Sequence, residues 1–210
     1  EWSKSMIWTG IEDASESVGE PGQDLIMAGY MALSGSAAMV RWDREGLRAR
    51  LPEELLQDVV TLEGQMTKKR TVFEEEFLTA AGATAWYPVA VGGIFNALWY
   101  MADHWESGFS VQLKDIPVRQ ETIEICEVEG KNPYYLWSAD CWLIAADHGN
   151  RVCEALKAQG IPAAVIGVLT DNRDKLLVHD STVSCLNRPK DDELDIFMSE
   201  RGVSMFHMEE

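Results

Sequence analysis

The chain has 210 residues, 46% of them hydrophobic, with a formal net charge of −17 and an isoelectric point near 4.6. This length and apolar content suffice to bury one substantial core, whereas the acidic excess disfavours binding to nucleic acids or anionic membranes. The sequence contains no run of 18 apolar residues, and Glu1 begins no basic-then-apolar signal segment, so we expect a cytoplasmic protein without a membrane span.

The first half of the chain predicts mainly helices. Pro52 suits a first helical turn, and Gly82 is a natural helix-ending residue. Ile94, Leu98 and Met101 share one helical face, which predicts a central, buried helix. The expected elements are a strand over 24–30 and helices over 33–50, 52–65, 72–81 and 92–105.

The second half predicts strands alternating with helices. The expected strands span 109–113, 142–146, 163–169 and 175–179, and the expected helices span 118–127 and 150–159. Arg173 and Asp174 suit a tight turn, which predicts that the last two strands form an antiparallel hairpin. The whole pattern predicts an α+β fold with a mixed, mostly antiparallel sheet and helices packed on one face.

One domain over 21–189 accounts for these elements. An N-terminal segment, 1–20, precedes it, and a polar tail, 190–210, follows it. The tail is polar enough to be partly disordered or to dock on a partner.

The cysteines and histidines do not predict a metal site. Cys126, Cys141, Cys153 and Cys185 are widely spaced, and neither a C-x-x-C nor an H-x-x-x-H pair occurs. We therefore expect buried free thiols and no bound metal.

Four motifs from residue 92 onward carry a resemblance to a known family. They are GGIFNALWYMAD (92–103), DIPVRQETIEICE (115–127), NPYYL (132–136) and GIPAAVIGVLTD (160–171). In this order they resemble the C-terminal domain of the aminoimidazole ribonucleotide (AIR) synthase superfamily, near the branch of the carbamoyl dehydratase that matures [NiFe] hydrogenases. The resemblance implies the same fold, and in the family a preceding domain supplies the magnesium and ATP contacts.

The positions that carry reactive groups in the family are mostly apolar here. A family motif of the form His-Asp-x-Thr-Glu aligns with Tyr87, Pro88, Ala90 and Val91, next to Trp86. General acid/base chemistry needs a titratable group, and of these replacements only Tyr87 could supply one. Family-type catalysis is therefore not expected.

Two further family motifs are also altered. Where the family has Ser-Ser-Gly-Ser, this chain has Asp140 and Cys141 at the glycine and final serine positions. A Gly-x-Glu-Gly-Thr phrase keeps its second glycine as Gly35, followed by Ser36, but loses its glutamate. Backbone N–H groups at that helix start could hold an anion, although N-capping is the ordinary role of serines there.

These replacements allow two interpretations of the cleft. Trp86, Trp137 and Trp142 are either ordinary core residues, which we favour slightly, or the lining of a pocket for an apolar or aromatic ligand. The candidate ligand-binding residues are Trp86, Tyr87, Gly92, Gly93, Trp137, Ser138, Asp140, Cys141, Gly35 and Ser36.

The candidate catalytic residues are Cys141, Asp140 and Tyr87. Cys141 could act as a nucleophile with His104 or His148 as its base and Asp140 as the orienting acid, but a buried cysteine beside a turn is the more ordinary interpretation.

Two function hypotheses follow. The first is a non-catalytic or repurposed domain that binds a ligand or assembles proteins through an aromatic-lined former active-site cleft. The alternative is a subunit of a split ATP-dependent enzyme whose ATP-binding domain, with Mg²⁺ and ATP, lies on another chain. Loss of the family's companion domain would leave an apolar face, which predicts a homo-oligomer or a hetero-complex.

Overall fold

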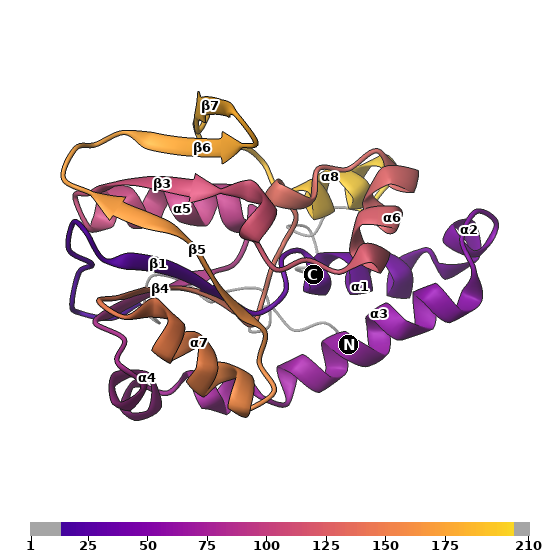
Figure 1. The fold of residues 1–210 in the computed structure, drawn as a ribbon. Coiled ribbons are helices and arrows are strands. Elements are labelled where there is room, and N and C mark those ends of the chain that lie inside the picture. Colours follow the sequence, from indigo (N-terminus) through magenta and orange to yellow (C-terminus); the bar gives the residue numbers. More distant parts are fainter. Residues whose placement is uncertain (1–13, 204–210) are drawn as a thin grey trace, which may run out of the picture.

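The structure is a computed structural model that describes residues 14–203, except for the side chains of residues 70 and 71 (Figure 1). Its strands are β1 (Asp24–Ala28), β2 (Ala85–Val89), β3 (Gly108–Gln112), β4 (Cys141–Ala146), β5 (Ala163–Thr170), β6 (Lys175–His179) and β7 (Thr182–Cys185). Its helices are α1 (Leu33–Trp42), α2 (Arg44–Arg48), α3 (Glu53–Thr67), α4 (Glu75–Ala81), α5 (Gly93–His104), α6 (Gln120–Glu129), α7 (Gly149–Ala158) and α8 (Glu193–Glu200). Short 3-10 helices are η3 (Arg70–Phe73), η4 (Leu113–Asp115) and η5 (Pro133–Tyr135).

The strands form one seven-stranded sheet in the order β2-β4-β1-β5-β3-β6-β7. All pairs are antiparallel except β3 with β6, which run parallel. The α+β class and the mixed, mostly antiparallel sheet are therefore confirmed. Every residue of β4 is buried, as are residues 25–28 of β1, so the core extends to both sides of the sheet's centre.

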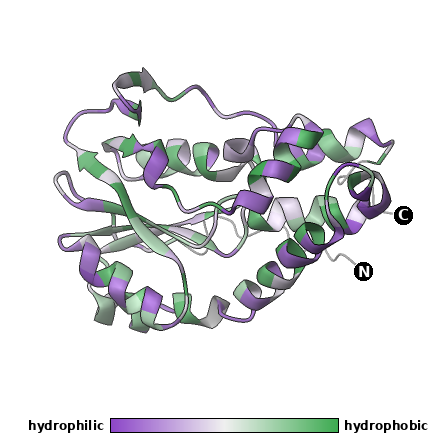
Figure 2. Cartoon of the chain, turned by 45° about the vertical axis from the view of Figure 1, so that its right-hand side comes forward, coloured by the Kyte–Doolittle hydropathy of each residue, from purple (hydrophilic) through white to green (hydrophobic). Residues whose placement is uncertain are grey.

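Helices cover both faces of the sheet, whereas the sequence indicated helices on one face. Asp24 of β1 accepts a hydrogen bond of 2.8 Å from the Gly149 N–H at the start of α7, and Asp24 pairs with Ala146. Tyr87 of β2 faces His104 of α5, and Tyr87 pairs with Leu143. Residues 143 and 146 point to opposite faces because side chains alternate along a strand. Figure 2 accordingly shows the hydrophobic strands lying between helices on either side.

A group of helices extends from one end of the sheet. Helix α1 contacts α3, α6 and α8, and these four lie together on the right of Figure 1. The single helix expected over 33–50 is divided at Asp43, which ends α1 and whose carboxylate caps α2 through the Gly46 N–H. Within the helix expected over 72–81, η3 precedes α4, and Gly82 ends α4 as expected.

The expected hairpin between the last two predicted strands is wrong. Strand β3 lies between β5 and β6 and pairs with both. The connecting loop passes across the end of β3, where the Phe109 N–H donates to Asp174 O at 2.8 Å. Gly108 permits this crossing, because a Cβ there would lie 2.5 Å from Asn172 O and 2.6 Å from Asp174 O.

Three elements were not expected from the sequence. They are β2, which runs through the aromatic Trp86-Tyr87 pair, β7, which is exposed, and α8, which lies in the polar tail. Residues 190–203 are packed on the domain, with Leu194, Phe197 and Met198 buried. Residues 1–13 and 204–210 of the two expected terminal segments lie outside the described residues.

Among residues 14–203, we do not find the single apolar face that we expected. Within residues 14–203, the exposed large hydrophobic side chains lie on separate elements: Val18, Trp42, Val91, Tyr100, Val168, Val183 and Ile196. None of the helices described in this range is long and apolar enough to cross a membrane.

Candidate functional site

Three loops that carry the candidate residues meet where the sheet joins the helical group. The Ser138 N–H donates to Ala90 O at 3.2 Å, and the Ala32 N–H donates to the Ser138 hydroxyl at 2.8 Å. The Gly35 N–H donates to Trp137 O at 3.0 Å. The β1–α1, β2–α5 and η5–β4 connections are therefore joined into one unit, and Gly35, Gly92 and Ser138 come together as the sequence indicated.

The aromatic side chains at this junction are core residues. Trp86, Trp137 and Trp142 are each less than 10% exposed. Trp142 stacks on Phe73 with 5.5 Å between ring centroids. The first of the two interpretations of the cleft is thus the one that the packing supports, because these rings fill space instead of lining an open pocket.

The proposed nucleophile and base are not brought together. The Cys141 thiol is buried and donates to Tyr30 O at 3.2 Å, and burial, with Asp140 adding to it, raises the pKa of this thiol far above its ordinary value. Cys141 begins β4, whereas His148 lies beyond the other end of the strand, roughly 20 Å away at about 3.3 Å per residue. His104 lies against Tyr87 at the C-terminal end of α5. Burial also raises the pKa of Tyr87, with Tyr100 adding to it.

The remaining polar candidates have structural partners. Asp140 has a positive φ of 56° and accepts a 2.9 Å hydrogen bond from the Thr67 hydroxyl at the end of α3. The Ser36 hydroxyl is within hydrogen-bond distance of Leu33 O (3.0 Å) and of the Thr122 hydroxyl (3.1 Å). The first contact joins α3 to the η5–β4 loop, and the Ser36–Thr122 contact joins α1 to α6.

The chemically most unusual group at the junction is Asp192, which the sequence did not indicate. Its carboxylate accepts hydrogen bonds from the Gly92 N–H, from the Trp137 N–H at 3.2 Å and from the Leu194 N–H at 2.7 Å. The side chain is only 3% exposed. Burial raises the pKa of Asp192 to about 6, and the three backbone N–H groups oppose this shift. The junction of the β2–α5 and η5–β4 connections, which we call the former cleft, is thus filled by a carboxylate of its own chain.

Asn96 completes this arrangement from the first turn of α5. Its side-chain N–H₂ donates to Lys190 O at 2.7 Å, and its Oδ1 accepts from the Lys190 N–H at 3.1 Å. Gly92 has φ of +79°, and a Cβ there would lie 1.9 Å from the Asn96 Nδ2. Glycine is therefore required for the Asn96 amide to close over the loop. A sequence signal for Asp192 existed in the capping pattern of Asp192 followed three residues later by Asp195.

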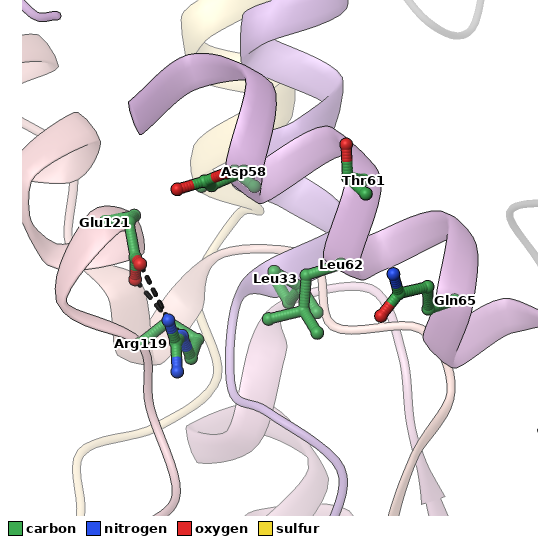
Figure 3. Close-up of a pocket in the computed structure, with 8 residues that line it drawn as sticks. Leu33, Asp58, Thr61, Leu62, Gln65, Arg119 and Glu121 are labelled. Atoms are coloured by element: carbon green, nitrogen blue, oxygen red, sulfur yellow. Dashed lines mark hydrogen bonds and ion pairs between the residues drawn. The ribbon is translucent and has the colours of Figure 1, made fainter. Parts of the chain in front are cut away.

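An open pocket lies elsewhere, between α3 and the starts of α1 and α6 (Figure 3). Its volume is about 230 Å³, with Leu33 and Leu62 side by side at its base. Arg119 and Glu121 form a two-point ion pair at one side, with N–O distances of 2.7 and 3.1 Å, and Asp58 points toward this pair. None of these residues was a candidate from the sequence. Between residues 14 and 203, no three His, Cys, Asp or Glu side chains are grouped so as to hold a metal.

Comparison with solved structures gives a consistent fold. E. coli HypE, a hydrogenase maturation protein, has a TM-score of 0.64 and 20% identity, with 85% of this chain and 53% of HypE covered. The HypE-HypF complex gives 0.61 and 18%, with 82% and 55% covered. Thiamine-monophosphate kinase from Stenotrophomonas maltophilia gives 0.56 and 15%, with 80% and 53% covered. The chain therefore spans about half the length of these proteins.

A search of curated protein sequences finds no match. The family described as AIR synthase related protein, C-terminal domain, matches residues 20–179, which is most of the chain. The matched region contains β1, the helices α1 and α5, and the β4–α7–β5 unit. The chain is a member of the AIR synthase C-terminal domain family, with a fold shared with HypE and thiamine-monophosphate kinase.

Proposed function

We propose that this domain is a non-catalytic binding module for protein assembly, built on the AIR synthase C-terminal fold. The observation that carries the proposal is that the cleft formed by the β2–α5 and η5–β4 connections holds Asp192 and buried tryptophan rings. The Asp192 carboxylate accepts hydrogen bonds from the backbone N–H groups that an anionic substrate would need.

The chemistry of the candidate residues supports the same proposal. Burial moves the pKa of Cys141 and of Tyr87 away from neutrality, so neither side chain is suited to exchange protons at physiological pH. Among residues 14–203, the Cys141 thiol has Tyr30 O as its hydrogen-bond partner, and His148 lies beyond the opposite end of β4. A nucleophile without a base at hydrogen-bond distance is not activated.

The compared structures favour an assembly role. One is a complex of HypE with HypF, so a protein of this fold forms a hetero-complex. The exposed hydrophobic residues of our chain are spread over several elements, which suits a polar, specific interface better than a large apolar one. A hetero-complex is accordingly the partner arrangement that we propose first, with a homo-oligomer as the second.

The alternative is an ATP-dependent enzyme whose nucleotide-binding part lies outside the residues described. HypE has been crystallised with ATP, and a related thiamine-monophosphate kinase has been crystallised with AMPPCP and TMP. Under this alternative, Gly92, Gly93 and the 138–141 loop would contribute to a shared cleft.

Isothermal titration of the purified chain with Mg²⁺ and ATP tests the alternative, because saturable binding is expected only if this chain contributes to a nucleotide site. We expect no binding at nucleotide concentrations up to about 1 mM, the upper part of the usual range for enzyme substrates. HypE, as a protein known to bind ATP, is the positive control. Native mass spectrometry of the same sample would report the assembly mass. Saturable ATP binding, or a retained nucleotide, would favour the alternative.

A further inference from the structure

Two groups of hydrogen bonds hold the segment that crosses the former cleft. The Asn96 amide pairs with both the N–H and the C=O of Lys190, as a neighbouring β-strand would. Two residues later, the Gly92 and Trp137 N–H groups meet the two oxygens of the Asp192 carboxylate. The pairing with Asn96 uses only the backbone of residue 190, so it does not depend on the side chain there. The Gly92 and Trp137 N–H groups, in contrast, require a hydrogen-bond acceptor on the side chain of residue 192.

The rest of the segment adds buried apolar side chains and partly buried ion pairs. Leu194, Phe197 and Met198 of α8 are buried against the helical group. Arg201 pairs with Asp43 at 2.9 Å and with Glu129 at 2.7 Å, and its guanidinium lies over the Phe197 ring at 3.7 Å. We refer to residues 190–203, which make all these contacts, as the strap.

The strap has the properties of a bound peptide. It lies beyond residue 179, where the match to the family domain ends. It joins the sheet only through the irregular 186–192 connection, and α8 has eight residues. A segment that lies outside the hydrogen-bond ladder of a sheet can open locally with less free energy than the central strands. The sheet order β2-β4-β1-β5-β3-β6-β7 includes no strap residue.

We propose that the cleft between Gly92, Asn96 and Trp137 is a recognition site for an acidic peptide, and that the strap is its resident, exchangeable occupant. A partner segment would replace the strap by making the same contacts. It would pair the N–H and C=O of one residue with Asn96, present a carboxylate two residues later, and continue as a short apolar helix. The proposal rests on the assembly role proposed above and names the chemistry of the partner.

The first test follows hydrogen–deuterium exchange in full-length chains. Asp192→Ala removes the acceptor of the Gly92 and Trp137 N–H groups. Buried donors without an acceptor lower the stability of the bound strap. We expect exchange across 190–203 to accelerate by about tenfold or more, while α5 and β4 stay as protected as in the unmodified chain. Asp191→Ala, an exposed neighbour with the same change in charge, is the control and should leave strap exchange unchanged.

The second test adds a fluorescein-labelled peptide with the sequence of residues 188–203. By fluorescence anisotropy, it should bind the Asp192→Ala chain about tenfold more tightly than the unmodified chain, whose own strap competes. The same peptide with alanine at the position of Asp192 should lose about tenfold in affinity. Asn96→Ala, introduced into the Asp192→Ala chain, should weaken binding of the parent peptide, because the backbone clamp is lost.

Three results would overturn the proposal. Strap exchange that accelerates only together with α5 and β4 would make the strap an ordinary part of the core. Absence of peptide binding to the Asp192→Ala chain would exclude exchange. Displacement of the peptide by millimolar inorganic phosphate alone would indicate a simple anion site. None of these depends on ATP, so failure here and failure of the non-catalytic assignment can be told apart.

Discussion

The thiol of Cys141 lies at the first position of β4, 2% exposed, with its S–H directed at Tyr30 O. Alkylating reagents attack the thiolate, and burial raises the pKa of this thiol. We therefore expect iodoacetamide at pH 8 to label the exposed Cys185 first and to leave Cys141 unmodified in the native protein. Peptide mass spectrometry against reaction time would measure this order. If Cys141 is labelled as fast as Cys185, then Cys141 becomes a candidate nucleophile again.

Gly92 tests whether the loop geometry matters to stability. Both Gly92 and Gly130 (φ of +64°) have left-handed backbone conformations that strain alanine. A Cβ at position 92 would also clash with the Asn96 amide, whereas a Cβ at position 130 would enter open space. The backbone alone costs about 1–2 kcal/mol, so we expect Gly130→Ala to lose about that much in urea denaturation. Gly92→Ala should lose about 1–3 kcal/mol more, because Asn96 must move. Equal losses would mean that Asn96 adapts freely.

Asp192 makes stability depend on pH in a defined direction. Its pKa of about 6 in the folded chain exceeds the ordinary 3.8, so between these values the folded state binds the proton that the unfolded state has released. Its contribution is therefore fully present below about pH 4 and is lost as pH rises through 6. The difference amounts to roughly 3 kcal/mol at 1.36 kcal/mol per pKa unit.

The measurement compares urea denaturation of the unmodified chain and Asp192→Asn at pH 4 and pH 7. Other carboxylates cancel in this comparison, because both chains carry them. The stability of the unmodified chain relative to the variant should fall between pH 4 and pH 7. A constant difference would show that the three N–H groups offset the effect of burial in full.

Single residues also show where sequence reasoning stopped. Gly35, Gly92 and the 137–141 loop could be expected to lie near one another because short motifs preserve their order. Asp192 could not, because it sits in an acidic run that is typical of a solvated tail. Its burial depends on donors at Gly92 and Trp137, which are distant in sequence.

At the scale of elements, helix α8 should contribute to stability although it lies in a polar segment. Phe197 is fully buried, whereas its neighbour Ile196 is 36% exposed. Removing a buried aromatic ring costs about 3–5 kcal/mol, so Phe197→Ala should strongly lower either the global stability or that of the strap alone. Ile196→Ala, the matched control, should cost less than about 1 kcal/mol. Thermal unfolding would give the global loss, and proteolysis of the strap would reveal a local one.

Elements with strong periodicity could be predicted, and pairing between strands could not. The apolar face of α5 and the continuous apolar run of β4 are local signals. The position of β3 between β5 and β6 depends on which strands pack together, and a four-residue loop suits either a hairpin or a crossing over one strand. Strand β2 escaped prediction because Pro88 argues against a central strand, and β2 lies at an edge of the sheet.

At the scale of the whole molecule, stability should decrease from the centre of the sheet toward the β7 edge. Strands β1 and β4 have neighbours on both sides and are buried on both faces, so their amides can exchange only when the domain unfolds. All four residues of β7 are exposed, and β7 has a single neighbour, β6. The opposite edge is protected, because the Trp86 backbone pairs with Ser15 through bonds of 2.9 and 3.0 Å.

Hydrogen exchange of the full chain therefore has an expected spatial order. The amides of β1 and β4 should exchange slowest and together, at a free energy that matches global unfolding by denaturant. Those of β7 should exchange fastest among the strands, by several powers of ten, because opening one exposed edge breaks few contacts. The strap should fall between them, since Asp192 and Phe197 are buried while the surrounding ion pairs are partly exposed. A strap as slow as β4 would mean that the cleft and its occupant open only when the whole domain unfolds, and the exchangeable site would then have no physical basis.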